Sequence, residues 1–307
     1  MKAILYNQYG SEEVLYEADI AIPAINANEV LVEVYSTSLN HFDLAERSGA
    51  FAKDTDVFPR ISGGKDFAGV VKEVGKDVTK FKAGDHVAGI TFGGTYAEYI
   101  AVNENFLAHV PEGTDLSTLG GVPVAGLTAW TAVVRKANIS AGQKVLIVGG
   151  SGGVGHVAVQ LAKSLGAYVI TTAGQKNIDF TKKLGADEVI DYNTPNYWET
   201  IQEVDAVIDA IGVNQNETMS VLKEGGIFIT MVRPPDQEVA AQYKITASYM
   251  QGEMTSENLQ NVMNAYINNE FVLHVHQTSS FDLEEIKKAQ AAFASKQNVG
   301  KWLIKFK

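Results

Sequence analysis

The sequence contains no cysteine among its 307 residues. This absence excludes disulfide bonds, thiolate nucleophiles, iron–sulfur clusters and any zinc site that needs cysteine ligands. Basic side chains are also outnumbered, since 25 lysines and arginines face 36 aspartates and glutamates, for a formal net charge of −11. An acidic surface repels phosphate backbones, so we expect no nucleic-acid partner.

Long apolar runs are missing as well. No stretch approaches the roughly 18 apolar residues of a transmembrane helix, and the first ten residues, MKAILYNQYG, are too polar for a secretory signal. The composition, 46% hydrophobic and 20% charged, is that of a globular protein. A chain of this length can form two domains. We therefore expect a cytoplasmic protein with no membrane partner.

A glycine-rich turn lies at the centre of residues 144–166, KVLIVGGSGGVGHVAVQLAKSLG. An apolar run before it predicts a buried strand, and the apolar spacing after it predicts an amphipathic helix. Gly150, Gly152 and Gly155 match the G-x-G-x-x-G pattern of dinucleotide-binding loops in this strand–turn–helix context. Such glycines permit the tight turn, the approach of backbone amides to a pyrophosphate, and close helix packing. The alternative is a tight glycine turn without a ligand.

The end of the next predicted strand distinguishes NAD from NADP. An NAD site usually has an acidic residue there, roughly 20 residues beyond the first glycine. Here residues 171–176 read TTAGQK, with no acid. Lys176 can neutralise a 2′-phosphate, together with the hydroxyls of Thr172 and Tyr192. We therefore predict NADPH as the cofactor; the alternative is that Lys176 is only a solvated loop lysine.

The pattern of strands and helices divides the chain into two predicted α/β domains. Residues 1–115 contain short alternating strands and glycine-rich turns, which predict a compact, partly open β-barrel. From residue 145 to residue 232 strands and helices alternate, which predicts a doubly wound parallel sheet, whereas residues 233–255 look irregular. Strands predicted at 271–276 and 301–306 suggest that the tail returns to the first domain. We expect domains at 1–118 with 271–307, and at 119–270.

Five motifs, spread over nearly the whole chain, are shared with one known superfamily. They are GGTYAEY at 93–99, VAGLTAW at 124–130, GGSGGVGHVAVQLAK at 149–163, DAVIDAIG at 205–212 and VGKWLIK at 299–305. With these motifs the chain resembles the medium-chain dehydrogenase/reductase superfamily. The resemblance implies a GroES-like catalytic domain that the C-terminal segment completes, a Rossmann domain, and an active site in the cleft between them.

The residues at the zinc positions of that superfamily differ in this chain. Its zinc enzymes use a cysteine and a Gly-His-Glu motif as catalytic ligands, and four cysteines in a structural lobe. The matching positions here read Ser38-Leu39-Asn40-His41 and Gly64-Lys65-Asp66. Lys65 replaces the histidine, and its ammonium group repels Zn²⁺ unless it is deprotonated. We therefore expect no metal.

The remaining motifs resemble the zinc-independent quinone and enone oxidoreductases. Their N-x-x-D-x-x-x-R-x-G motif is met by Asn40, Asp43, Arg47 and Gly49. This resemblance implies NADPH-dependent reduction of quinones, or of the C=C bond of α,β-unsaturated carbonyl compounds, by hydride transfer. It also implies that Asn40 and Thr128 lie beside the nicotinamide. The residues that it implies for cofactor binding are Gly150, Ser151, Gly152, Gly153, Val154, Gly155, Thr172, Lys176, Tyr192, Gly212 and Lys301.

Roles for four further side chains follow as hypotheses. Lys65 either polarises the substrate carbonyl or is a lysine on the rim of the cleft. Tyr96 is expected to line the pocket. Asp43 and Arg47, four residues apart on a predicted helix, are expected to form a salt bridge.

Two other functions and one assembly remain to be weighed. The first rival is a non-catalytic NADPH-binding protein, either a redox sensor or a relative of the crystallin kind. The second is a zinc alcohol dehydrogenase. Members of the group that the chain resembles commonly dimerise through the edge of the Rossmann sheet, so we expect a homodimer with residues 227–232 as the edge strand.

Overall fold

The computed structural model describes residues 1–295 and 298–306. The chain forms two compact units, each discontinuous in sequence. Unit 1 comprises Met1–Val124, Met254–Asn264 and Val275–Lys307, and unit 2 comprises Ala125–Glu253 and Ala265–His274. The domain boundaries predicted at residues 118 and 270 stay predictions, and residues 296, 297 and 307 of the predicted first domain lie outside the described residues.

Unit 1 is built from two sheets. The smaller sheet has the order β2-β1-β4, and the larger has the order β15-β16-β3-β5-β6-β8, with β7 also paired to β3. The strands are β1 (Lys2–Tyr6), β2 (Leu15–Asp19), β3 (Glu29–Ser38), β4 (Arg60–Ile61), β5 (Asp66–Val74), β6 (His86–Ile90), β7 (Tyr99–Asn103), β8 (Leu107–His109), β15 (Val275–Ser280) and β16 (Lys301–Lys305).

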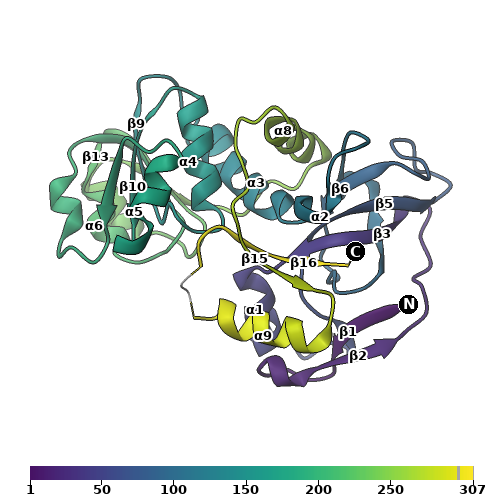
Figure 1. The fold of residues 1–307 in the computed structure, drawn as a ribbon. Helices are drawn as coiled ribbons and strands as arrows, with labels where there is room; N and C mark the ends of the chain where they lie inside the picture. Colours follow the sequence, from purple (N-terminus) through teal and green to yellow (C-terminus); the bar gives the residue numbers. More distant parts are fainter. Residues whose placement is uncertain (296–297, 307) are drawn as a thin grey trace. The chain divides into compact units, whose positions relative to one another are not determined.

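The C-terminal strand completes the larger sheet of unit 1. Strand β16 pairs antiparallel with β3, with Leu303 opposite Ser38 and Lys305 opposite Ser36. Figure 1 shows these last strands beside the much earlier strand β3. The tail therefore returns to the N-terminal sheet, and it brings Lys301 to the end of β3.

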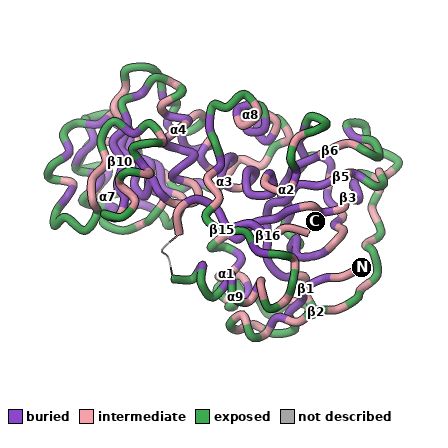
Figure 2. The backbone as a smooth tube through the Cα atoms, in the orientation of Figure 1, coloured by how far each residue is buried: buried purple, intermediate pink, exposed green. Residues whose placement is uncertain are grey.

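Alternation along β3 explains why the core of the larger sheet forms here. Val30, Val32 and Val34 occupy every second position, and all three are buried against Phe67 and Val71 of β5. Figure 2 shows the buried stretches that run along β3 and β5. Burial of such branched side chains on one face stabilises the sheet that carries the site residues at the end of β3.

Unit 2 contains one parallel sheet with the order β11-β10-β9-β12-β13-β14. This is the doubly wound order in which the chain starts in the middle of the sheet and adds strands outward on both sides. Its strands are β9 (Lys144–Val148), β10 (Tyr168–Ala173), β11 (Glu188–Asp191), β12 (Val204–Asp209), β13 (Leu222–Thr230) and β14 (Thr246–Tyr249). The predicted parallel sheet is confirmed.

The α-helices are 4 to 12 residues long. They are α1 (His41–Ser48), α2 (Leu116–Leu119), α3 (Val122–Trp130), α4 (Gly155–Ser164), α5 (Ile178–Lys183), α6 (Gln215–Met219), α7 (Gln237–Gln242), α8 (Ser256–Ile267) and α9 (Leu283–Phe293). A π-helical segment, η3 (Thr131–Lys136), continues α3. The 3₁₀ segments are η1 (Glu12–Val14), η2 (Glu104–Phe106), η4 (Gln175–Asn177) and η5 (Tyr197–Thr200). No helix among residues 1–295 and 298–306 has the length and apolarity needed to cross a bilayer.

Three sequence expectations are wrong at the ends of the elements. Residues 233–255 are not irregular, because they contain α7 and β14. Strand β15 begins at Val275 rather than at residue 271. Strand β13 is interior, and β14 forms the edge of the sheet. Strand β14 has only four residues, TASY, without strong apolar alternation, so its sequence carries almost no strand signal.

Candidate functional site

The glycine loop follows β9 and is fixed to the end of β10. Gly149 has a positive φ of 89°, which glycine adopts without strain. The Gly149 amide donates to Thr172 Oγ1 at 3.0 Å, and the Gly150 amide donates to the Thr172 carbonyl at 3.0 Å. Thr172 is buried. Its hydroxyl therefore holds the loop in place, a role that the sequence had not suggested for it.

Two of the three motif glycines are required by close packing. A Cβ at Gly150 would lie 2.1 Å from Thr171 Oγ1, and a Cβ at Gly155 would lie 2.0 Å from the Gly149 carbonyl oxygen. Gly152 differs, because the nearest atom to its Cβ position is the Gly149 oxygen at 3.4 Å, an ordinary contact. Gly152 therefore faces open space, as a glycine beside a ligand would.

Free amides gather at this loop and at the start of α4. Within residues 1–295 and 298–306, no atom accepts a hydrogen bond from the backbone amides of Ser151, Gly153 or Val154. Val154, at the N-cap of α4, provides no side-chain cap. Unpaired N–H groups at a helix start attract anions. The loop thus fits a pyrophosphate, which Gly152, Gly153 and Val154 would hold.

The predicted 2′-phosphate residues are exposed beyond β10 and β11. Lys176 lies in η4 and is exposed, and Tyr192 has 56% of its surface accessible. The Tyr192 hydroxyl lies 3.0 Å from the Cβ position of Gly174, so the phenol covers this glycine. The ammonium and the phenol therefore lie after neighbouring strands, and their contact with a 2′-phosphate stays a prediction.

Gly212 takes its place in a turn after β12. Its φ is 79°, its amide donates to Asp209 Oδ1 at 2.8 Å, and its carbonyl accepts from Arg233 Nε at 3.1 Å. Asp209 is fully buried and also accepts from Gln215 Nε2 at 2.8 Å. This carboxylate therefore fixes the turn that contains Gly212.

Three apolar side chains near the same strand ends were missed by sequence reasoning. Ile211, Val213 and Val232 are exposed although they are hydrophobic, and they lie two to four residues beyond the ends of β12 and β13. Ligands of open parallel sheets bind at the carboxyl ends of the strands. The signal that could have revealed them is an apolar residue soon after the end of a buried strand.

Thr128, on α3, is half-buried, and its hydroxyl lies 3.8 Å from the Cβ position of Gly252.

In unit 1 a buried network surrounds Asn40, which precedes α1. Asp66, fully buried at the start of β5, accepts from Ser38 Oγ at 2.5 Å and from Asn40 Nδ2 at 3.0 Å. Lys301 Nζ donates to Asn40 Oδ1 at 2.7 Å and lies 3.7 Å from Asp66 Oδ2. The Val124 amide also donates to this carboxylate, at 3.3 Å. Both ends of the Asn40 amide are therefore held.

Lys301 has a different immediate task from the one that the resemblance implied. Its side chain is buried, and besides Asn40 and Asp66 it contacts the Leu39 carbonyl at 3.2 Å. Its positive charge offsets the buried charge of Asp66, which would otherwise be costly. In this geometry Lys301 orients Asn40, and any contact with a cofactor stays a prediction.

The expected salt bridge between Asp43 and Arg47 is wrong. Asp43 Oδ2 instead accepts from the Asn40 backbone amide at 2.7 Å, and so caps α1. Arg47 Nε donates to Gln290 Oε1 at 2.8 Å, and its guanidinium lies 3.8 Å from Glu12. An unpaired amide at the start of a helix requires an acceptor, and the Asp43 carboxylate provides it instead of forming an ion pair on the helix face.

Burial changes the acid–base behaviour of Asp43. Desolvation raises the pKa of this carboxyl to about 7, against the opposing effect of the hydrogen bond from the Asn40 backbone and of nearby Lys65 and Lys301. Its Oδ1 has no hydrogen-bond partner within residues 1–295 and 298–306. The residue that holds the backbone of Asn40 is therefore one that titrates near neutrality.

Lys65 is buried, with 8% of its surface accessible, and so it is not a lysine on an exposed rim. Its ammonium forms an ion pair with Glu46 at 3.1 Å, donates to the Phe92 carbonyl at 3.1 Å, and lies 5.0 Å from the centroid of the Phe42 ring. Phe42 stacks on Phe51, and both rings are about half exposed. Lys65 thus stands at the base of an exposed aromatic pair.

Tyr96 is fully buried in a hydrophobic cluster with Tyr6 and Leu39. A Cβ at Gly63 would lie 2.1 Å from its ring, so the chain folds tightly around it. Burial raises the pKa of its hydroxyl well above the ordinary value. This placement favours a packing role, and it gives no support to a role in lining an open pocket.

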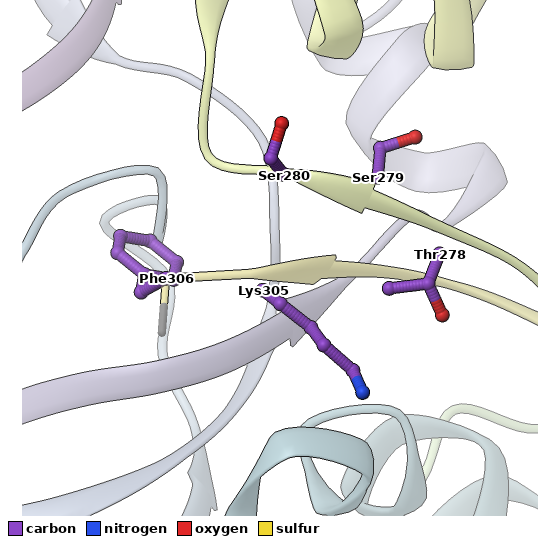
Figure 3. A pocket seen from close by; sticks show the side chains of 5 residues that line it. All are labelled: Thr278, Ser279, Ser280, Lys305 and Phe306. Carbon is purple, nitrogen blue, oxygen red and sulfur yellow. The ribbon is translucent and has the colours of Figure 1, made fainter.

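Metal-ligating side chains and one cavity of unit 1 remain to be compared with these groups. Within the described part of the chain, no three His, Cys, Asp or Glu side chains gather in a way that could hold a metal ion. A cavity of about 350 Å³ lies on β15 and β16, lined by Thr278, Ser279, Ser280, Lys305 and Phe306. Figure 3 shows the two serines pointing away from Lys305, so these polar groups do not converge.

Comparison with known proteins agrees with these two units. Residues 26–112 match the family model of the alcohol dehydrogenase GroES-like domain, and residues 153–260 match that of the zinc-binding dehydrogenases. The quinone oxidoreductase of Coxiella burnetii has a similar structure, with a TM-score of 0.93 and 32% identity over 100% of this chain and 99% of that chain. The chain belongs to the medium-chain dehydrogenase/reductase family. Its β-rich unit is therefore GroES-like and its parallel sheet is a Rossmann fold, as predicted.

Other members of the medium-chain dehydrogenase/reductase family indicate the branch. The NADPH-dependent alkenal/one oxidoreductase of Arabidopsis thaliana chloroplasts is 37% identical over 250 residues, or 76% of this chain and 64% of that protein. The 2-methylene-furan-3-one reductase of Solanum lycopersicum is 35% identical over the same shares. The chain spans just under two thirds of the length of these two relatives.

Proposed function

We propose that this chain is an oxidoreductase that uses NADPH to reduce quinones or the C=C bond of α,β-unsaturated carbonyl compounds without zinc. One observation carries the proposal: the three side chains at the zinc-ligand positions are already engaged. Ser38 donates to Asp66, Asp66 is paired with Lys301, and Lys65 is paired with Glu46. A cation at that place would meet two ammonium groups and no thiolate.

The two units supply different parts of the proposed reaction. NADPH, when bound, supplies the hydride. The glycine loop of unit 2 binds the phosphates through backbone amides, and Lys176 with Tyr192 receives the 2′-phosphate. In unit 1, Asn40 is held rigidly by Asp66 and Lys301, so its amide keeps one orientation without rearrangement. The exposed rings of Phe42 and Phe51 offer a flat apolar surface, which suits a planar substrate.

A turnover assay with a metal control tests the proposal. The oxidation of NADPH is followed with a naphthoquinone, a phenanthrenequinone and a reactive enone, before and after treatment with EDTA. We expect turnover with at least one of these compounds, unchanged after EDTA, and weaker activity with NADH. Tight binding of NADPH without any turnover would support the redox-sensor or crystallin-like alternative. Loss of activity after EDTA, in a protein whose metal analysis shows stoichiometric zinc, would support a zinc alcohol dehydrogenase.

Two further properties belong to the proposal. Relatives in plants and animals include chloroplastic and mitochondrial proteins by name, whereas we propose a cytoplasmic location for this chain, which cell fractionation tests. We also propose a homodimer. The pairing strand of such a dimer is β14, since β13 lies inside the sheet.

A further inference from the structure

A histidine of α4 links the glycine loop to a distant segment of unit 2. His156 is fully buried and is the second residue of the helix. Its Nδ1 lies 2.9 Å from the carbonyl oxygen of Gly152, and its Nε2 lies 3.2 Å from the backbone amide of His274. The two ends of one imidazole ring thus contact backbone groups that are more than one hundred residues apart in the sequence.

These partners define the protonation state of the ring. A carbonyl oxygen can only accept, so Nδ1 carries the hydrogen and donates to Gly152. A backbone amide can only donate, so Nε2 is bare and accepts from His274. A neutral imidazole in the Nδ1–H form satisfies both of these contacts at once.

The contact with Gly152 also determines the direction of the next amide. In a planar trans peptide the C=O and N–H bonds point in opposite directions. The Gly152 carbonyl accepts from the His156 imidazole and, at 3.0 Å, from the His156 backbone amide. The Gly153 amide, in the same peptide group, is consequently turned the other way, and within the described residues it has no acceptor.

Without the imidazole contact, the hydrogen bond from the His156 backbone amide would be the remaining restraint on this carbonyl among the described residues. Gly152 and Gly153 have no side chains, so they can adopt a wider range of φ and ψ angles than other residues. Each conformation that turns the Gly153 amide away from the phosphates would reduce affinity, because only the oriented fraction binds. A buried side chain that fixes the carbonyl removes this cost before the ligand arrives.

We propose that His156 is a positioning residue that presents the Gly153 amide to the cofactor pyrophosphate by holding the Gly152 carbonyl. The proposal rests on the proposed binding of NADPH. It goes further by assigning the order of the glycine loop to a side chain outside the glycine motif, and by extending the connection to the backbone at His274. His274 is the last residue of unit 2 before the chain enters β15, and its ring packs 4.5 Å from that of Phe180.

The chain offers a matched control one helical turn further along. Gln160 Nε2 donates to the Val272 carbonyl at 3.0 Å, and Gln160 Oε1 accepts from the Val272 amide at 2.9 Å. Gln160 therefore ties α4 to the same distant segment. Gln160 Nε2 also donates to the His156 carbonyl at 2.8 Å, but among the described residues no hydrogen bond joins Gln160 to Gly152, so its loss leaves the loop carbonyl held.

Affinity measurements on two variants test the proposal. His156→Leu keeps the volume and loses both side-chain hydrogen bonds, whereas Gln160→Leu loses the contacts to the segment and one to the His156 carbonyl but leaves the imidazole in place. The dissociation constant of NADPH is measured by fluorescence, with thermal unfolding as a check on folding. We expect the constant to rise about 10-fold or more in His156→Leu and less than about 3-fold in Gln160→Leu. Equal effects of the two variants, or no effect of His156→Leu, would overturn the proposal.

Two measurements without cofactor separate this proposal from the proposed function. In ¹⁵N-histidine-labelled protein the His156 signals should be those of the neutral Nδ1–H form, and the opposite tautomer or a cationic ring contradicts the proposal. Hydrogen exchange at the Gly152 and Gly153 amides should accelerate in His156→Leu but not in Gln160→Leu. If the wild-type protein binds no NADPH while both results hold, the positioning of the loop stands and the proposed function fails.

Discussion

At the scale of single residues, the sequence could predict which residues belong to the candidate site, but it could not predict their contacts. The motif that contains Asn40, Asp43 and Arg47 predicts where the chemistry lies, but it could not show which partner each charge takes. A spacing of four residues on a helix suggested a salt bridge, whereas the free amide at the helix start captures Asp43. Lys301 is 261 residues from Asn40 in sequence, and only the return of β16 to β3 brings them together.

Lys65 provides the first prediction at this scale. Its ammonium is occupied by Glu46 and the Phe92 carbonyl, so we expect it to stabilise the fold around the aromatic pair rather than to polarise a substrate. Lys65→Met should lower the free energy of unfolding by about 1 kcal/mol and change kcat less than about 3-fold. Urea unfolding and steady-state kinetics measure the two effects.

Glu46→Gln is the matched control for Lys65. It keeps the ammonium but removes the charge that neutralises it, while Arg60, 3.3 Å from Glu46, loses one ion pair as well. If Lys65 acted on the carbonyl, this variant would keep or raise kcat while Lys65→Met lowered it by about 10-fold or more. That divergence would show that the role is catalytic.

Asp43 gives a prediction about pH. Burial raises the pKa of this carboxyl to about 7 in the folded state from 3.8. Between these values the folded state holds one more proton than the unfolded chain, so this group's stability contribution declines as the pH rises from about 4 to about 7. The slope is at most about 1.4 kcal/mol per pH unit. Asp43→Asn cannot titrate and should lack this decline.

Urea unfolding at pH 5 and at pH 8 checks the prediction. The wild-type protein should lose stability relative to Asp43→Asn at the higher pH, and the exposed Asp179→Asn should show no such change relative to wild type. A difference between wild type and Asp43→Asn that is the same at both pH values would mean that this carboxyl does not titrate in the folded state within that range.

At the scale of elements, the strand–turn–helix around the glycine loop was the most predictable part of the chain. Its strong apolar run and its glycines are local signals, and they place β9, the loop and α4 correctly. The short elements α7 and β14 were missed because four to six residues are too few to show a period. The position of β14 is decided by its pairing with β13, which is a tertiary effect.

The glycine loop also supports a prediction that separates folding from binding. Gly152 has room for a Cβ, so Gly152→Ala should fold with a change in unfolding free energy below about 1 kcal/mol. Its methyl group would occupy the space next to the free amides, and the dissociation constant of NADPH should rise about 10-fold or more. Gly155→Ala meets the Gly149 oxygen at 2.0 Å and should be destabilised by about 1 to 3 kcal/mol.

Calorimetric titration and urea unfolding on both variants provide the comparison. The important result is the contrast, since Gly152→Ala should lose affinity without losing stability. If Gly152→Ala bound NADPH as wild type does, the open space in front of this glycine would not be the phosphate site.

At the scale of the whole molecule, the two-part organisation could be predicted because its signals are spread along the chain. Alternating strands, then strands alternating with helices, then a strand-containing tail predict one β-rich and one doubly wound unit, and the family comparison confirms both. The edge of the Rossmann sheet could not be predicted in the same way. An edge is defined by the absence of a neighbour, and the neighbour of β13 proved to be a strand of four residues.

The identity of that edge leads to the last prediction, which concerns assembly. Strand β14 pairs with β13 on one side and, among the described residues, with no strand on the other, and Thr246 and Tyr249 are exposed on it. An edge of this kind invites a second copy to pair across a two-fold axis. We expect a dimer in sedimentation velocity at micromolar concentration. Thr246→Lys with Tyr249→Lys should sediment as a monomer, because like charges would then face each other across the axis. Glu188→Lys, on β11 at the opposite edge, should leave the dimer intact. A monomeric wild type, or a dimer broken only by the β11 substitution, would assign the interface elsewhere.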